Sequence, residues 1–270
     1  FSSIPQRGDV VFYDELIHAS IRDGLQMGLA KSYKFKHNDL EDLQAKIEKL
    51  TTSGEIYVVT ESIFSMDGDH PDLPALVKFC NEKNIFLVVD EAHALGVFGE
   101  TGEGLLQHLN LHHKVFARIV TFGKGLGAHG AAILGSETLK EFIINFTRSF
   151  IYTTAIAPHS VATISSAYQE LAHTSALKKL QQNIAYFQQQ IENLALKDVF
   201  IASDSAIQSC IVPGNEQVKA IAEKLQQQQY LVKPILSPTV AKGEERLRFC
   251  LHSYNLKQEI FSVLQCLKHE

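Results

Sequence analysis

The sequence has no excess of positive charge. It contains 25 lysines and arginines against 30 aspartates and glutamates, which gives a formal net charge of −5 and a pI near 6.2. Proteins that bind nucleic acid usually gather lysine and arginine on a basic face. We therefore expect no nucleic-acid partner.

Long hydrophobic runs are missing as well. No apolar stretch approaches the roughly 20 residues that a transmembrane helix needs, and the first residues, Phe1 to Pro5, lack the basic segment and apolar core of a secretion signal. With 45% hydrophobic and 20% charged residues, the composition is ordinary for a globular protein with a large core. We expect a cytoplasmic protein with no membrane partner.

Cysteine is scarce and widely spaced. Because no Cys-x-x-Cys pair occurs, neither a zinc site nor a disulfide framework is indicated, and we expect reduced, mostly buried thiols at Cys80, Cys210, Cys250 and Cys266. Three histidines could share a helix face and bind a metal, namely His108, His112 and His113. No carboxylate or cysteine is suitably spaced beside them, so we interpret them as a solvated helix end and expect no metal.

The chain does contain β-branched apolar runs that alternate with amphipathic stretches. This pattern is typical of an α/β fold with a mostly parallel sheet whose strands are buried on both faces. One helix is expected over Asn38–Leu50, with Asn38 as its cap. The other elements expected here are strands at Asp9–Tyr13, Ile56–Thr60, Ile85–Asp90, Ile119–Phe122 and Ala131–Leu134, and helices at Leu16–Leu29 and Leu73–Glu82.

From about Pro158 the pattern becomes longer and more helical. We expect a large domain over residues 1–157 and, over residues 158–270, a connecting helix and a smaller α+β domain. The first strand enters the sheet with no preceding helix to cover it, so we expect the amino-terminal part of the large domain to be missing from this chain. The elements expected after Pro158 are helices at His159–Leu171, Ala176–Leu194, Glu216–Gln227 and the carboxyl end, and strands at Ala206–Val212 and Arg246–Leu251.

Two residues that follow predicted strands carry the strongest chemical signal. Asp90 ends one buried run, and Lys124 follows the next strand, among the glycines of the run 123–127. In an open parallel sheet, ligands bind beyond the carboxyl ends of the strands. Pyridoxal phosphate chemistry needs a lysine that binds the cofactor aldehyde and a carboxylate that keeps the pyridine nitrogen protonated. The pair predicts such a site, although an aspartate at this position could instead cap a helix.

Further candidates lie near the same strand ends. His93, three residues after Asp90, could bind the phenolic oxygen of the cofactor, although taken alone it is more often a loop histidine. Thr121 ends the strand before Lys124, and its hydroxyl could bind a phosphate oxygen. Ser65 lies in an acidic turn after another strand.

Two more candidates come from the ends of the chain. His18 falls just after the first strand and could lie flat against a planar cofactor. Arg248 belongs to the smaller domain, where its guanidinium N–H groups could bind a substrate carboxylate in a bidentate manner. An alternating Arg-Leu-Arg-Phe strand explains this arginine equally well.

Four runs, at residues 14–20, 59–68, 90–96 and 238–248, follow one another in an order that resembles the α-oxoamine synthases. These are fold-type I pyridoxal phosphate enzymes that condense an amino acid with an acyl thioester. The resemblance covers nearly the whole chain and implies this fold, pyridoxal phosphate, small-molecule substrates and a homodimer. Runs 120–132 and 151–154 are most similar to the branch of biotin biosynthesis, which joins alanine to a pimeloyl thioester.

The resemblance also implies a role for each candidate. Lys124 would hold the cofactor and remove the α-proton of the amino acid, Asp90 would bind the ring nitrogen, and His18 would stack on the ring and contact the substrate. The resemblance further implies that cofactor oxygens are bound by His93, Ser65 and Thr121. It implies that the phosphate of the neighbouring subunit is bound by Thr153 or Thr154, and that the substrate is contacted by Thr239 and Arg248.

Two alternatives remain open at the level of the sequence. The first is another enzyme on the same fold, either a sibling synthase that uses glycine or serine with a different acyl chain, or an aminotransferase or lyase. The second is a non-catalytic module that binds the cofactor or dimerises, since a fold alone does not guarantee activity.

Overall fold

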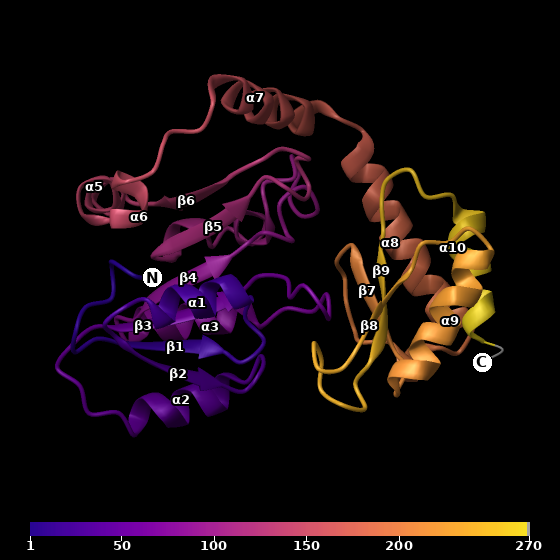
Figure 1. Cartoon of the computed structure of the whole chain (residues 1–270), viewed down its shortest axis with the longest axis horizontal. Coiled ribbons are helices and arrows are strands. Elements are labelled where there is room, and N and C mark those ends of the chain that lie inside the picture. Colours follow the sequence, from indigo (N-terminus) through magenta and orange to yellow (C-terminus); the bar gives the residue numbers. More distant parts are fainter. Residues whose placement is uncertain (269–270) are drawn as a thin grey trace. The chain divides into compact units, whose positions relative to one another are not determined.

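The computed structural model describes residues 1–268, which divide into two compact units (Figure 1). The larger unit comprises residues 1–64 and 70–173, and the smaller unit comprises residues 65–69 and, of the described residues, 174–268. We expected the boundary between residues 157 and 158, one helix earlier. Helix α7 (Pro158–His173) belongs to the larger unit, where the Tyr168 ring packs edge-on against Phe122 and Ile164 packs on the cluster that contains Leu95.

A six-stranded sheet forms the centre of the larger unit. Its strand order is β2-β1-β3-β4-β5-β6; all neighbours pair in parallel except β6, which is antiparallel to β5. This confirms the predicted fold class. The strands are β1 (Val10–Asp14), β2 (Lys31–Phe35), β3 (Ile56–Glu61), β4 (Phe86–Asp90), β5 (Ala117–Thr121) and β6 (Ala131–Gly135).

Strand β2 was not expected from the sequence. Its residues, Lys-Ser-Tyr-Lys-Phe, are exposed except for Phe35, because β2 lies at the edge of the sheet. An edge strand with one buried side chain carries almost none of the apolar signal that marks a central strand.

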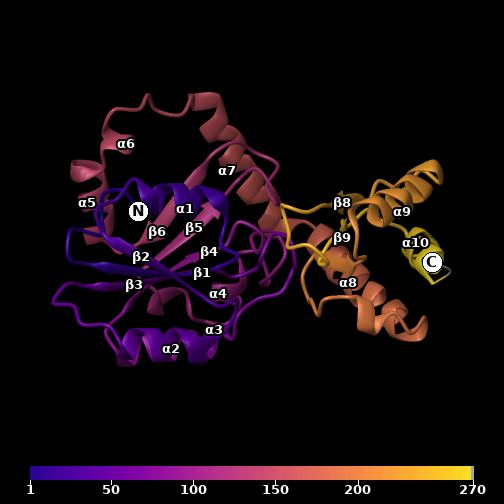
Figure 2. The ribbon, with the colours of Figure 1, turned by 60° about the horizontal axis from the view of Figure 1, so that its bottom comes forward.

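Helices cover both faces of this sheet (Figure 2). On one face lies α1 (Ala19–Gln26), whose Ile21 and Leu25 join Val11 and Val59 in one buried cluster. Leu139 of α5 (Glu137–Phe146) packs in the same cluster. The opposite face carries α2 (Leu40–Glu48) and α3 (Leu73–Glu82), and α3 has the bounds predicted for it.

The predicted cap of α2 was wrong, and two further expectations were met only in part. Helix α2 is capped by Asp39, whose Oδ1 accepts the Asp42 N–H at 2.8 Å, whereas Asn38 precedes the cap in a left-handed conformation with φ of 53°. His108 ends α4 (Leu105–His108) while His112 and His113 lie on the separate 3₁₀ turn η1 (His112–Lys114), so the three histidines do not share a helix face. Of the cysteines, only Cys80 and Cys210 are buried.

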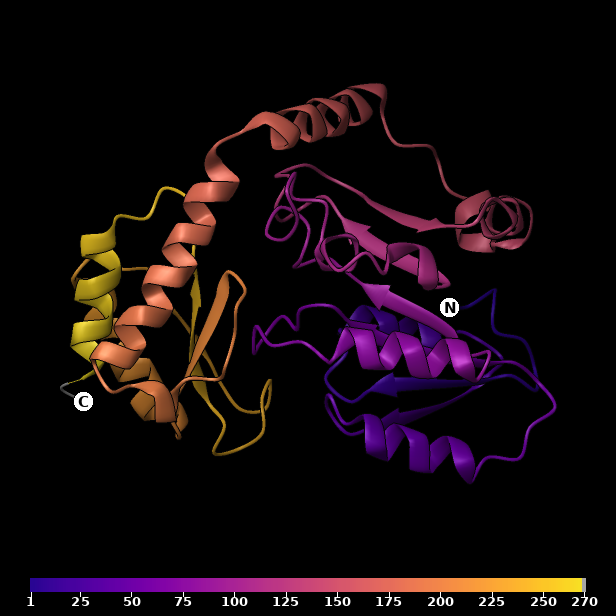
Figure 3. The ribbon, with the colours of Figure 1, turned by 180° about the vertical axis from the view of Figure 1, so that it is seen from behind.

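The smaller unit is an antiparallel three-stranded sheet of order β7-β9-β8 with helices packed on one face (Figure 3). The α+β pattern expected for this part is present, but the three-residue strand β8 was not expected. Phe187 of α8 packs against Phe200 and Phe249, which ties the longest helix to the sheet. The elements are α8 (Ala176–Asn193), η2 (Lys197–Val199), β7 (Ile207–Ile211), α9 (Asn215–Gln227), β8 (Lys233–Ile235), β9 (Arg246–Cys250) and α10 (Lys257–Leu267).

Over residues 1–268, no helix combines the length and the apolar character needed to cross a bilayer. The longest, α8, is amphipathic: its buried side chains, which include Leu180, Ile184 and Phe187, recur on one face.

Candidate functional site

The four strands β1, β3, β4 and β5 run in parallel, so their carboxyl ends meet at one edge of the sheet. These strands end in Asp14, Glu61, Asp90 and Thr121. Strands β2 and β3 lie on opposite sides of β1 in the sheet. The strand order therefore reverses next to β1, and this topological switch point lies at the same edge. This edge is where open α/β sheets bind their ligands.

Asp90 is a buried carboxyl group at this edge, with 8% of its surface exposed. Its Oδ1 accepts the Ala92 N–H at 2.8 Å. Burial raises the pKa of Asp90, and the Ala92 N–H and the positive charges of Lys124 and His18 oppose the rise. A cation held against Asp90 would therefore stabilise its charged form.

Lys124 lies at the same edge, on a tight loop between β5 and β6. Gly127 N–H donates to the Lys124 carbonyl at 3.0 Å, and Ala128 N–H donates to the Phe122 carbonyl at 2.8 Å. A Cβ on Gly125 would lie 2.3 Å from the Leu95 carbonyl oxygen. Only glycine therefore lets the lysine loop pack directly on the turn that follows Asp90.

The turn that follows Asp90 carries His93 and is held by a buried ion pair. Glu91 Oε2 lies 2.5 Å from Nη2 of Arg118, and Glu91 Oε1 accepts the Leu106 N–H at 2.8 Å. Backbone N–H groups of Ala94 and Leu95 donate to the Glu91 carbonyl. These bonds anchor both ends of the segment that joins β4 to α4.

The hydroxyl group of Thr121 forms no hydrogen bond with any other described residue. Its Oγ1 is buried and has no hydrogen-bond partner within residues 1–268. A buried hydroxyl is stabilised when it is bonded, so this atom is suited to an oxygen of a bound ligand.

His18 caps α1 from the loop that follows β1. Its Nδ1 lies 2.8 Å from Ser20 Oγ and accepts the Ser20 N–H at 3.3 Å, so the ring of this exposed residue is oriented locally. Its backbone N–H donates to Glu61 Oε1 at 2.7 Å.

Glu61 is a residue of this edge that was not predicted from the sequence. It is 3% exposed and is the register partner of Asp90 on the neighbouring strand. Burial raises the pKa of Glu61 to about 8, the charge of Asp90 adds to the rise, and the His18 N–H and Lys124 oppose it. The sequence did contain a signal for Glu61, because this carboxylate ends an apolar strand just as Asp90 does.

A second group of predicted residues belongs to the smaller unit. Arg248 Nε donates to the Ser65 carbonyl at 2.6 Å, and its Nη1 lies 3.0 Å from Cys250 Sγ. The neighbouring Arg246 forms a buried ion pair with Asp67. The two arginines of β9 thus hold the segment 65–69, which explains why this segment belongs to the smaller unit. Thr239 lies at an exposed position after β8.

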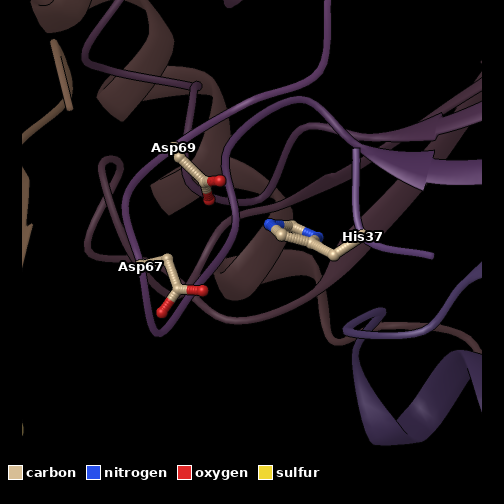
Figure 4. Close-up of side chains that lie close together, drawn as sticks. All are labelled: His37, Asp67 and Asp69. Atoms are coloured by element: carbon tan, nitrogen blue, oxygen red, sulfur yellow. The ribbon is translucent and has the colours of Figure 1, made fainter. Parts of the chain in front are cut away.

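Three side chains from two loops of the chain are drawn in Figure 4. Asp67 and Asp69 come from the loop between β3 and α3, and His37 comes from the loop between β2 and α2. Within the larger unit, His37 Nδ1 lies 2.9 Å from Asp14 Oδ1. Asp14 also accepts the Asn38 N–H at 2.9 Å, so it serves to hold this loop.

Thr153 and Thr154 follow the short helix α6 (Arg148–Ile151) at exposed positions. The Thr153 hydroxyl donates to the Ser149 carbonyl at 2.6 Å. The local structure therefore occupies this hydroxyl as a donor and leaves its lone pairs available.

Pyridoxal phosphate was the cofactor expected at this site, and the residues present fit it. Asp90 is a buried carboxylate that a protonated ring nitrogen would stabilise, and Thr121 offers an unbonded hydroxyl to an oxygen of the cofactor. Lys124 is exposed three residues after Thr121, and its charge acts to lower the pKa of Asp90. The donor set therefore matches the charged and polar parts of this group.

The fold and the site place the chain among the fold-type I α/β enzymes. The family model "Aminotransferase class I and II" matches residues 4–263, and the chain belongs to this family. Among curated proteins it is similar to an 8-amino-7-oxononanoate synthase from Emericella nidulans, with 37% identity over 99% of this chain and 69% of the relative. A protein of the same name from Cellvibrio japonicus is 39% identical over 98% of this chain and 67% of the relative.

Solved structures give the same result. An 8-amino-7-oxononanoate synthase from Francisella tularensis superposes with a TM-score of 0.86 and 30% identity, over 99% of this chain and 77% of that one. A Sphingomonas wittichii serine palmitoyltransferase superposes with a TM-score of 0.91 and 26% identity, over 99% and 67%. The chain spans about two thirds of the length of the curated relatives named above. The resemblance to α-oxoamine synthases is thereby confirmed.

Proposed function

We propose that this protein is the pyridoxal phosphate-dependent α-oxoamine synthase of biotin biosynthesis that forms 8-amino-7-oxononanoate from L-alanine and a pimeloyl thioester. A carbon–carbon bond forms between the alanine Cα and the acyl carbonyl, the thiol leaves, and the alanine carboxyl is lost as carbon dioxide. The observation that carries the proposal is the meeting of Asp90 and the Lys124 loop at one edge of the sheet. Relatives of this name at 37% and 39% identity support it.

The cofactor, when bound, supplies an electron sink for the charge left on Cα after the proton is removed. Asp90 would bind the ring nitrogen, and its negative charge would keep that nitrogen protonated. Lys124 would hold the cofactor covalently until the amino acid takes its place, and its released amine would then take the Cα proton of the substrate. His18 would lie against the ring, and its local bonds to Ser20 restrict the rotation of the imidazole.

The other predicted residues bind the polar groups of cofactor and substrate in this proposal. Thr121 binds an oxygen of the cofactor through its unbonded Oγ1, and His93 and Ser65 bind further cofactor oxygens. Thr239 and Arg248 contact the substrate. In a homodimer, Thr153 or Thr154 binds the phosphate held by the neighbouring subunit.

Product analysis tests this proposal. The protein with pyridoxal phosphate is incubated with pimeloyl-CoA, or with pimeloyl-carrier protein, and one amino acid at a time. We expect 8-amino-7-oxononanoate, free thiol and carbon dioxide in equal amounts from L-alanine. The absence of product from alanine with either thioester would overturn it.

A sibling synthase is the second candidate, and one observation favours it. The serine palmitoyltransferase structure superposes with a higher TM-score, 0.91 against 0.86, although its sequence identity is lower. Acyl-chain choice depends on the shape of an apolar pocket, where one methylene changes binding by only about 1–3 kcal/mol. Turnover of serine or glycine with a longer or shorter acyl-CoA, in place of alanine, would identify this candidate.

A further inference from the structure

We propose that Glu61 is a positioning residue of this site, which acts on the reaction through His18 by holding the His18 backbone N–H at the end of β3. The inference rests on the proposed function, because it assigns a purpose to the position of His18. It concerns a contact within this chain that forms without any ligand.

The geometry of the contact carries this inference. Glu61 Oε1 accepts the His18 N–H at 2.7 Å and joins two residues that are 43 positions apart in the chain. The preceding residue, Ile17, is fully buried, whereas His18 itself is exposed. The bond therefore fixes the point at which the chain leaves the core and presents the imidazole at the edge of the sheet.

Two separate anchors hold His18 as a result. Glu61 holds its backbone, and Ser20 holds its ring through contacts to Nδ1 of 2.8 Å from Oγ and 3.3 Å from the backbone nitrogen. For the His18 ring to lie flat on a planar group, both the position of the His18 backbone and the rotation of the side chain must be restricted. Loss of either anchor would leave an exposed histidine free to take other positions.

The charges around Glu61 suit it to this purpose. Asp90 and Asp14 face it with negative charge, and Lys124 faces it with positive charge. Burial raises the pKa of Glu61 to about 8, so near neutral pH the carboxyl accepts the His18 N–H while it is mostly uncharged. It can thus hold His18 without placing a second full negative charge beside Asp90.

Amide hydrogen exchange of the cofactor-free protein tests the contact directly. Glu61→Leu keeps a side chain of similar bulk but removes the acceptor, so protection of the His18 amide should fall by about tenfold or more. Glu61→Gln keeps an acceptor oxygen and should restore the protection. As a control, Glu15→Ala removes the carboxylate that accepts the His37 N–H at 3.2 Å, and it should lower protection at residue 37 but not at residue 18.

A double-mutant cycle tests whether Glu61 acts through His18. We expect Glu61→Leu to weaken binding of pyridoxal phosphate and of the amino acid by about tenfold in the wild-type background, and to add nothing when His18 is already alanine. An equal loss in both backgrounds, or unchanged protection of the His18 amide, would overturn the proposal. If the wild-type protein bound no cofactor, the proposed function would fail, while the exchange experiment would still report on the contact.

Discussion

Glu61 and Asp90 are register partners at the ends of two neighbouring parallel strands, β3 and β4. Both carboxyl groups are buried, and burial, followed by the charge of Asp90, raises the pKa of Glu61. Two carboxyl groups at adjacent strand ends are costly to the fold unless a proton or a cation is present. The pair therefore indicates a site built to receive positive charge.

Glu61→Gln should make the stability of the cofactor-free protein less sensitive to pH. The pKa of Glu61 rises from its ordinary value of 4.5 to about 8 on folding. Between these values the unfolded chain releases a proton that the folded chain keeps, so the wild type loses stability as pH rises through this window, by at most about 1.4 kcal/mol per pH unit. Glutamine does not ionise, so the variant should lack this loss.

Urea unfolding at pH 5, 7 and 9 measures this effect. The free energy of unfolding of the variant minus that of the wild type should be larger at pH 7 than at pH 5, and larger again at pH 9. A difference that is the same at pH 5 and pH 9 would show that Glu61 does not keep its proton in the folded protein.

Lys124→Ala should abolish covalent attachment of pyridoxal phosphate and turnover while leaving the fold intact, because Lys124 is exposed on a loop. Borohydride reduction followed by mass spectrometry of the intact protein detects the attachment, and circular dichroism monitors the fold. Lys78→Ala, on the exposed side of α3 with 75% of its side chain accessible, serves as the control and should keep both properties. Attachment that persists in Lys124→Ala would contradict the assignment.

Gly125→Ala should displace the lysine loop. The added Cβ would lie 2.3 Å from the Leu95 carbonyl oxygen, a backbone atom that cannot move aside cheaply. We expect a loss of about 1–3 kcal/mol in the free energy of unfolding, as for overpacked sites, together with weaker cofactor binding.

Gly123→Ala is the matched control for this loop. Its Cβ would meet only the Ala128 carbonyl oxygen, at an ordinary 3.7 Å. Thermal melts and cofactor titration of both variants measure the contrast. If the two variants behaved alike, the close packing of Gly125 on Leu95 would not be what positions Lys124.

Arg118→Ala should strongly destabilise the larger unit, because it leaves Glu91 buried without its partner. Removal of one member of a buried ion pair typically costs about 3–5 kcal/mol. Lys140→Ala breaks an exposed pair with Glu137 and should cost less than about 1 kcal/mol. Denaturant titration separates the two, and a small effect of Arg118→Ala would show that the pair is not needed to hold the turn.

The sequence determined most of the larger unit because its central strands are buried on both faces, and such strands are continuous apolar runs. The same runs marked where the site begins, since Asp90 and Thr121 end two of them. The order in which the four motifs follow one another along the chain also indicated the family. The edge strand β2 and the cap of α2 escaped prediction, because a single buried side chain at Phe35 and two adjacent cap residues, Asn38 and Asp39, leave too little local signal.

Only the tertiary structure decided which distant groups meet. No local pattern indicates that Glu61 holds the backbone of His18, or that Gly125 packs on Leu95. The pairing of Arg246 with Asp67, which assigns the segment 65–69 to the smaller unit, depends in the same way on residues far apart in the chain. Burial and hydrogen bonding across such separations arise from the packing of whole elements, so the sequence supplied the candidate residues and the fold set their environment.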